Sequence, residues 1–220
     1  MITISQAVEE IIRKKPFITE SITDGIINYS ALANKLKPEV EAKLLKKVNV
    51  SAILMSLRRL QITNDIGITQ KVEKLAAWFG DIIVRSNLAD YTFRNSDTLL
   101  KKQQALLKKI ADRDDFFYTI SQGVYETTFV LSDLLKDEIP EIFESEKIIS
   151  YRYGLSSITI KLPAENIDQP GLYYFIFRKL AWEGINILEV ISTTNEITIL
   201  LRDKDIDHAF SAIKNLKTKS

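Results

Sequence analysis

The chain contains no cysteine and only one histidine among its 220 residues, and both shortages exclude classes of site. Without thiols there is no disulfide bond, no thiolate nucleophile and no cysteine-based zinc site. His208 by itself cannot assemble a metal site, so we expect it to be a surface or boundary residue. We therefore expect no metal and no other cofactor.

Glycine is also scarce, and the seven glycines are all isolated from one another. A nucleotide phosphate loop needs neighbouring glycines, so that backbone N–H groups can surround the phosphates. The sequence has no such run, and no set of side chains indicates another catalytic centre. These features predict a protein that is not a kinase or another enzyme.

Long hydrophobic runs are missing as well. No stretch of about 18 apolar residues occurs, as a membrane-spanning helix would require. The first five residues, MITIS, lack the basic and then apolar pattern of a secretory signal. With the absence of cysteine, these features favour a cytoplasmic location.

The net charge of +1 is unevenly distributed. Residues 1–60 contain ten Lys and Arg against six Asp and Glu, whereas residues 61–220 contain twenty against twenty-three. A basic head on a mildly acidic body is typical of proteins whose head binds nucleic acid. On charge alone, the alternative that these are ordinary surface charges without a nucleic-acid partner is equally acceptable.

The first part of the chain shows the apolar spacing of short helices with tight junctions, interrupted at Pro16 and Pro38. This pattern predicts a helical, helix-turn-helix-like domain over residues 1–64, followed by a connecting helix over residues 65–80. Its candidate DNA contacts are basic residues, for which a solvated helix face is the alternative: Lys35, Lys43, Lys46, Lys47, Arg58 and Arg59.

A repeat divides the rest of the chain. Residues 126–133, ETTFVLSD, match residues 196–203, EITILLRD, at an offset of 70. Ile120-Ser121 matches Ile191-Ser192 at an offset of 71, which predicts turns that differ by one residue. The economical interpretation is an α+β fold with two tandem βαββαβ units, at residues 81–153 and 154–220, each with helices on one face of an antiparallel sheet.

Residues 184–201 of the second unit read GINILEVISTTNEITILL, and residues 168–171 read DQPG. Both segments resemble the ACT domains of aspartate kinases, and the second is similar to the D-x-P-G loop before the first helix of these modules. The resemblance covers about residues 157–216 and applies only to the regulatory part of those enzymes. It extends more weakly to the first unit, where Arg94-Asn95-Ser96 stands in place of the loop. It implies ferredoxin-like ACT units that pair with a second chain and bind an amino acid in the seam.

The resemblance also implies the residues of this seam. Gly171 would let a ligand carboxylate approach the N–H groups at a helix N-terminus. The expected ligand site comprises Asp168, Gln169, Pro170, Gly171, Asn186, Ile187, Ser192 and Thr193. The alternative is that this segment is only a turn and a helix start.

Residues 25–33, GIINYSALA, and 52–59, AILMSLRR, are similar to regulators of amino-acid metabolism that join a helix-turn-helix-like head to an ACT domain. This resemblance implies an amino-acid sensor whose ligand controls DNA binding by the head. The alternative is a regulatory or interaction subunit of a biosynthetic enzyme such as aspartate kinase, without DNA binding. Tyr173, Tyr174 and Phe177 add a second apolar helix face, which predicts a homodimer or a higher homo-oligomer.

Overall fold

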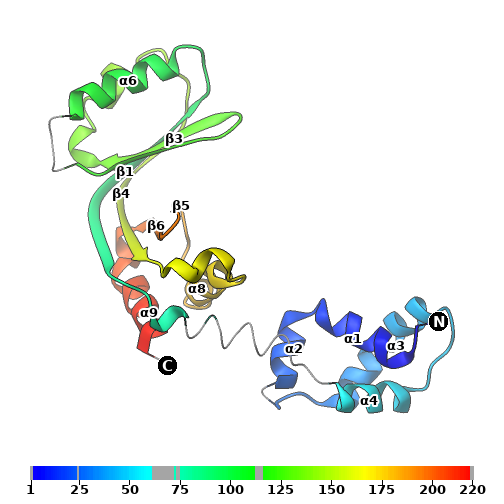
Figure 1. Cartoon of the computed structure of the whole chain (residues 1–220). Coiled ribbons are helices and arrows are strands. Elements are labelled where there is room, and N and C mark those ends of the chain that lie inside the picture. Colours follow the sequence, from blue (N-terminus) through cyan, green and yellow to red (C-terminus); the bar gives the residue numbers. More distant parts are fainter. Residues whose placement is uncertain (1, 24, 61–71, 73–74, 112–115, 219–220) are drawn as a thin grey trace. The chain divides into compact units, whose positions relative to one another are not determined.

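The computed structural model describes residues 2–23, 25–60, 72, 75–111 and 116–218 (Figure 1). The chain forms two compact units, Met1–Lys71 and Val72–Ser220, called here the helical head and the sheet unit. Most of the predicted connecting helix lies outside the described residues. Its described end belongs to the sheet unit, because Val72, Ala76 and Phe79 are buried in a core there.

Within residues 2–23 and 25–60, the helical head forms four helices: α1 Ile4–Arg13, α2 Pro16–Thr23, α3 Tyr29–Leu44 and α4 Val50–Arg59. A capping box starts α1, because the Thr3 hydroxyl accepts the Gln6 N–H while the Gln6 side chain accepts the Thr3 N–H at 2.9 Å. Pro16 begins α2, which the sequence pattern did not predict. The first helical position tolerates proline, since its missing N–H has no helical partner there.

Helix α3 continues through Pro38, where the sequence predicted an interruption. The ring removes one backbone donor, and Pro38 lies on the exposed face of the helix. The opposite face supplies Leu32, Leu36 and Val40 to the core. Burial of this face holds the helix together despite the lost bond.

The described part of the sheet unit forms a six-stranded sheet in the order β2-β3-β1-β4-β6-β5, with all neighbours antiparallel. Its strands are β1 Ile82–Arg94, β2 Tyr118–Gln122, β3 Glu126–Ser132, β4 Ile148–Lys161, β5 Glu189–Ser192 and β6 Glu196–Arg202. Among its described residues are the α-helices α6 Leu99–Ile110, α7 Ile139–Ile142, α8 Leu172–Trp182 and α9 Ile206–Thr218. In Figure 1, β1 and β4 curve together through the whole sheet.

The two long strands serve both βαββαβ repeats. The first repeat consists of the later part of β1, α6, β2, β3, α7 and the start of β4. The second consists of the later part of β4, α8, β5, β6 and α9, and its fourth strand is the start of β1, residues 82–85. The tandem division at residues 81–153 and 154–220 therefore needs correction, because residues 82–85 lie in the first segment but supply a strand to the second repeat.

The internal sequence repeat coincides with matching structure. Strands β3 and β6 carry the matched segments and both lead into 3₁₀ turns, η1 Asp133–Leu135 and η3 Asp203–Asp205. The predicted one-residue difference in the preceding turns is wrong. The turns close with the same hydrogen bond, from Gly123 N–H to the Glu126 carbonyl at 2.8 Å and from Thr193 N–H to the Glu196 carbonyl at 2.9 Å.

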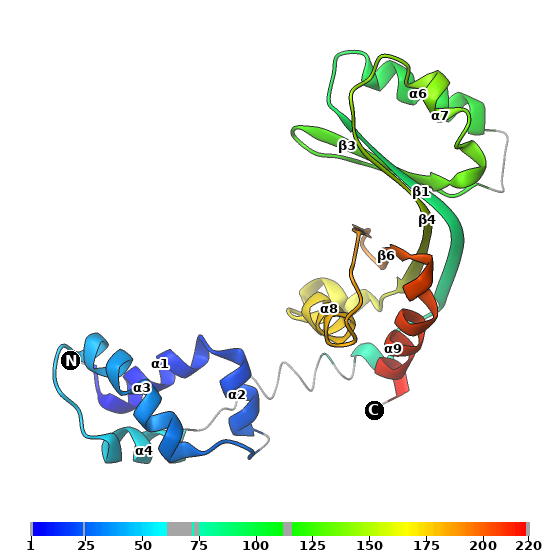
Figure 2. The same cartoon turned by 180° about the vertical axis from the view of Figure 1, so that it is seen from behind.

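Each repeat has its own core on the helix-covered face of the sheet. Figure 2 shows α6 and α7 together over the first repeat and α9 beside β6 in the second. On the opposite face, a small cluster joins the repeats, formed by Leu88, Val130, Leu155 and Leu200 with Phe117, Leu188 and Ile191 packed against it. The second repeat thus has a core to which α8 and α9 contribute, and a loop before α8 that remains at the surface.

Candidate functional site

The loop before α8 presents an open helix N-terminus. A 3₁₀ turn, η2 Ala164–Asp168, leads to Gly171, which has a φ of 95° and stands at the N-cap of α8. This left-handed conformation favours glycine. Glycine also has no side chain to cap the first N–H groups of the helix, so these donors and the helix dipole are available to an anion.

The other predicted loop residues surround this position. Asp168 and Pro170 are exposed, and Gln169 is half-buried. The Gln169 amide donates to the Pro170 carbonyl at 3.1 Å, which holds the turn before Gly171. None of these contacts uses the N–H groups of the first turn of α8.

The turn between β5 and β6 lies against the same end of α8. The Asn166 amide donates to the Thr194 carbonyl at 3.0 Å, and the Tyr173 hydroxyl lies 2.5 Å from Ser192 Oγ. Ser192 and Thr193, which the resemblance implied, are therefore brought to the edge that contains Gly171. Asn166 and Tyr173 were not predicted as site residues. Tyr173 was identified only as part of an apolar helix face.

Asn186 and Ile187 lie at the other end of α8. The N–H of Ile185 donates to the Leu180 carbonyl, so the chain is attached to the last turn of the helix just before Asn186. Eleven residues of α8 separate the two ends, about 16 Å along the axis. Within one chain, these two residues and Gly171 do not form one pocket.

Helix α8 also exposes an aromatic face. Tyr174 is 50% exposed and Trp182 is 77% exposed. The Arg178 guanidinium lies between them in sequence and is 5.6 Å from the centre of the Tyr174 ring. The Phe177 ring is half-buried and lies 6.2 Å from the Tyr173 ring. Tyr, Trp and Arg are the residue types most enriched at the centres of protein interfaces.

His208 is exposed and contacts a carboxylate: its Nε2 lies 3.0 Å from Glu183 Oε2. Lys179 Nζ contacts the same carboxylate at 2.5 Å. The hydrogen bond from Lys179, followed by that from His208, lowers the pKa of Glu183. The described residues contain no group of three or more His, Cys, Asp or Glu placed to hold a metal ion.

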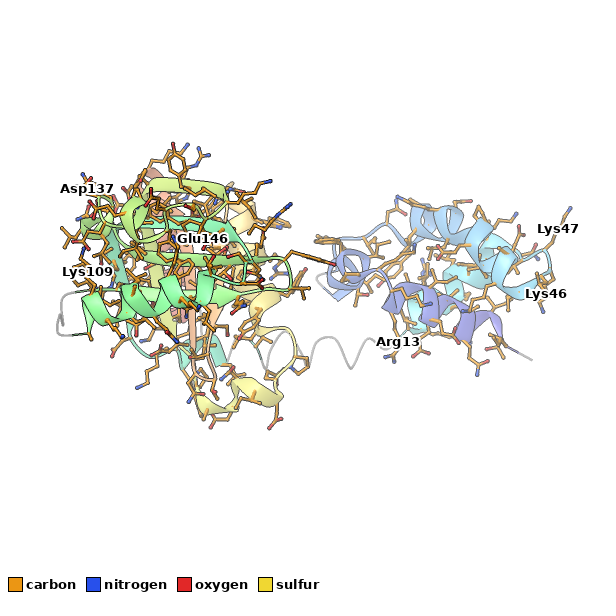
Figure 3. The ribbon with its side chains drawn as sticks, turned by 90° about the horizontal axis from the view of Figure 1, so that it is seen from above. Arg13, Lys46, Lys47, Lys109, Asp137 and Glu146 are labelled. Carbon is orange, nitrogen blue, oxygen red and sulfur yellow. The ribbon has the colours of Figure 1, made fainter. Side chains whose placement is uncertain are left out.

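The predicted DNA contacts of the head lie in α3, in the turn after it and at the end of α4. Lys43 pairs with Glu10, and the other predicted DNA contacts are exposed: Lys35, Lys46, Lys47, Arg58 and Arg59. Figure 3 shows Lys46 and Lys47 at one end of the head. Residues 42–64 contain no Asp or Glu, so this segment carries only positive charge.

No described helix is both long enough and apolar enough to span a bilayer.

No protein-family model matches the chain, and no curated protein matches its sequence. Solved structures do resemble it. The ligand-free regulatory subunit of aspartate kinase from Thermus thermophilus matches with a TM-score of 0.52 and 16% identity, over 63% of this chain and 98% of that subunit. Aspartate kinase from Clostridium acetobutylicum matches with a TM-score of 0.51 and 16% identity, over 61% of this chain and 34% of the enzyme.

Aspartate kinase from Synechocystis gives a similar result, with a TM-score of 0.51 and 19% identity over 62% of this chain and 26% of the enzyme. The chain thus spans about a third or less of these full-length kinases and nearly the whole of the isolated regulatory subunit. At these identities the likeness establishes a shared fold. One of the structures that share this fold is a regulatory subunit of aspartate kinase alone.

Proposed function

We propose that the chain is a regulatory protein that binds a free amino acid at the N-terminus of α8 and is not itself an enzyme. The observation that carries this proposal is the uncapped helix start at Gly171, beside a turn with hydroxyl groups at Ser192 and Thr193. An α-carboxylate suits the free N–H groups there. The likeness to isolated regulatory subunits of aspartate kinase supports a regulatory rather than a catalytic role.

A second copy of the chain completes the site in this proposal. Strand β5 is at the edge of the sheet, and the exposed aromatic face of α8 lies in the same repeat. Asn186 and Ile187 are about one helix length from Gly171 within a chain. In a homodimer or larger assembly, the same residues of a second copy can approach the Gly171 end and contact the bound amino acid.

A thermal-shift screen against the twenty common amino acids tests the proposal. A ligand at 100 times its Kd stabilises the folded protein by about 2.7 kcal/mol. Gly171→Val should abolish the shift, because the branched side chain covers the helix N–H groups. Gly154→Val is the matched control, since Gly154 also has a positive φ, 64°, and lies in the same unit away from α8. Equal ligand shifts in the two variants would place the site elsewhere.

The head is a second candidate site, for duplex DNA, through which the bound amino acid would control transcription. The observation that favours it is the acid-free segment 42–64, which includes α4 with its terminal Arg58 and Arg59. Phosphate contacts by Lys and Arg release counterions, so affinity falls with salt by about one unit of slope for each contact. Arg58→Gln with Arg59→Gln should flatten that slope by about two units.

The matched control for this experiment removes two other positive charges of the head. Lys15 and Lys37 each pair with a glutamate, at 3.0 Å and 3.9 Å. Lys15→Gln with Lys37→Gln should leave the salt slope unchanged if α4 is the contact surface. If no duplex binds at 50 mM salt, the remaining candidate is a regulatory subunit of a separate amino-acid biosynthetic enzyme.

A further inference from the structure

The junction before α6, in the first repeat, is closed by a carboxylate of the chain itself. Glu146 Oε2 accepts a hydrogen bond from Ser96 Oγ, and Glu146 Oε1 accepts one from Thr98 Oγ1, both at 2.6 Å. The Leu99 N–H, in the first turn of α6, donates to Ser96 Oγ at 3.1 Å. Glu146, labelled in Figure 3, is thus attached through two hydroxyl groups to the start of the helix.

This carboxylate is held in its ionised form. Partial burial raises the pKa of Glu146, but the hydrogen bonds from Ser96 and Thr98 and the nearby charge of Lys102 outweigh it, and the pKa is lowered. An ionised carboxylate at the start of a helix is also favoured by the helix dipole. The Glu146 carboxylate thus makes the kind of hydrogen bonds that the carboxylate of a bound ligand would make.

Backbone hydrogen bonds show which residue of the second repeat corresponds to Glu146. The Asn95 N–H donates to the Tyr125 carbonyl, as the Leu162 N–H donates to the Asn195 carbonyl, and residues 125 and 195 share the offset of 70. One residue earlier, the Arg94 N–H donates to the Lys147 carbonyl, as the Lys161 N–H donates to the Asp81 carbonyl. Lys147 therefore corresponds to Asp81.

The counterpart of Glu146 is consequently Gly80, which has no side chain. A Cβ at Gly80 would lie 3.0 Å from Cβ of Lys161, so the position is also crowded. The loops differ as well. Only four residues lead from Asn95 to the start of α6, whereas ten lead from Leu162 to the start of α8 and end in Gly171. The second repeat lacks the internal carboxylate and has the longer, open loop.

We infer that Glu146 takes, in the first repeat, the place that the amino-acid carboxylate takes in the second. The chain then binds one amino acid, at the start of α8. In the first repeat, Glu146 already occupies the corresponding position at the start of α6. The assignment of the ligand to the second repeat rests on the proposed function. The role of Glu146 does not, because it follows from contacts within the chain.

Rescue by acetate tests the role of Glu146 in the full chain. Glu146→Ala should lower the Tm, and sodium acetate should restore it in a saturable way, compared with sodium chloride at the same ionic strength. Glu144→Ala is the matched control, because it removes the same charge from an exposed residue of the same turn. Glu144 supplies only its backbone carbonyl to Lys102. The start of α8 is open to acetate in every variant, so the change in Tm of the unaltered chain is the baseline, and Glu144→Ala should not exceed it.

Three outcomes would overturn the inference: an unchanged Tm in Glu146→Ala, no saturable rescue, or equal rescue of Glu144→Ala. If the screen identifies an amino acid, calorimetry should give one site per chain, and two sites in the unaltered chain would also overturn it. If no amino acid binds, the proposed function fails by itself. The acetate experiment then still decides whether Glu146 acts as an internal ligand.

Discussion

Replacing Arg152 by methionine should lower the free energy of unfolding of the sheet unit by about 2–4 kcal/mol, because it leaves a buried carboxylate unpaired. Asp90 is 1% exposed, and its Oδ2 accepts a hydrogen bond from Arg152 Nη1 at 2.7 Å. Its Oδ1 has no hydrogen-bond partner within the described ranges. Removing one partner of a fully buried pair costs about 3–5 kcal/mol. The Arg152 side chain is 46% exposed, so water reduces the expected loss.

Glu189 gives this loss a pH dependence. Burial, followed by the charge of Asp90, raises the pKa of Glu189, whereas Arg152 opposes the rise. Without Arg152, two carboxylates face each other at neutral pH. A raised pKa in the folded state means that protonation favours folding, so the penalty is complete above that pKa and disappears below the unfolded value. The loss should therefore be smaller at pH 4.5 than at pH 7.

Urea unfolding followed by tryptophan fluorescence measures the effect. Both tryptophans, Trp78 and Trp182, belong to the sheet unit, so the signal reports on that unit. Arg94→Met is the control, because Arg94 is an exposed arginine at the end of β1. The reasoning fails if Arg152→Met is within about 0.5 kcal/mol of this control, the usual range for surface changes. It also fails if adding Asp90→Asn to Arg152→Met recovers none of the loss.

Three further predictions concern other parts of the chain. Lys179 and His208 lower the pKa of Glu183, so Glu183→Gln should lower the Tm at pH 7, and the difference should vanish as the pH falls through the folded pKa, below the ordinary value of 4.5. Thr3→Ala removes the capping box with Gln6 and should destabilise the helical head by about 0.5–2 kcal/mol in circular dichroism, with no change in the tryptophan signal. Light scattering at micromolar concentration should give the mass of at least two chains, and the mass of one chain would contradict the proposed assembly.

A helix or strand could be predicted from the sequence where a single residue pattern determines it. The internal repeat predicted equivalent elements at residues 126–133 and 196–203, and the equivalent strands β3 and β6 carry these segments. Helix α2 was missed because Pro16 reads equally as the end of one helix or the first position of another. The choice between them depends on tertiary contacts such as the hydrogen bond from the buried Thr19 hydroxyl to the Ile12 carbonyl.

The sharing of β1 and β4 was not predictable from periodicity. Ile82 pairs with Ile160, far away in sequence, and no local pattern indicates such a partner. In the candidate site, too, one feature could be predicted from the local sequence and another could not. A glycine at the start of a helix was a local signal for Gly171, whereas the contact between Tyr173 and Ser192 arises only when α8 packs against the end of β5. No sequence pattern indicated the role of Glu146. Only the structure shows that Glu146 and its counterpart Gly80 each lie two residues before a long strand.

The use of the start of β1 by the second repeat has a consequence for folding. During synthesis, residues 82–85 emerge before every possible partner in the second repeat, and they stay unpaired until residues 157–160 follow. The first repeat can pair its own strands once residues 148–153 have been made, but the second repeat cannot close its sheet before residues 157–160 pair with the start of β1. We therefore expect the sheet unit to unfold in one cooperative transition. A chain ending at Tyr153 would leave the start of β1 as an unpaired, aggregation-prone edge.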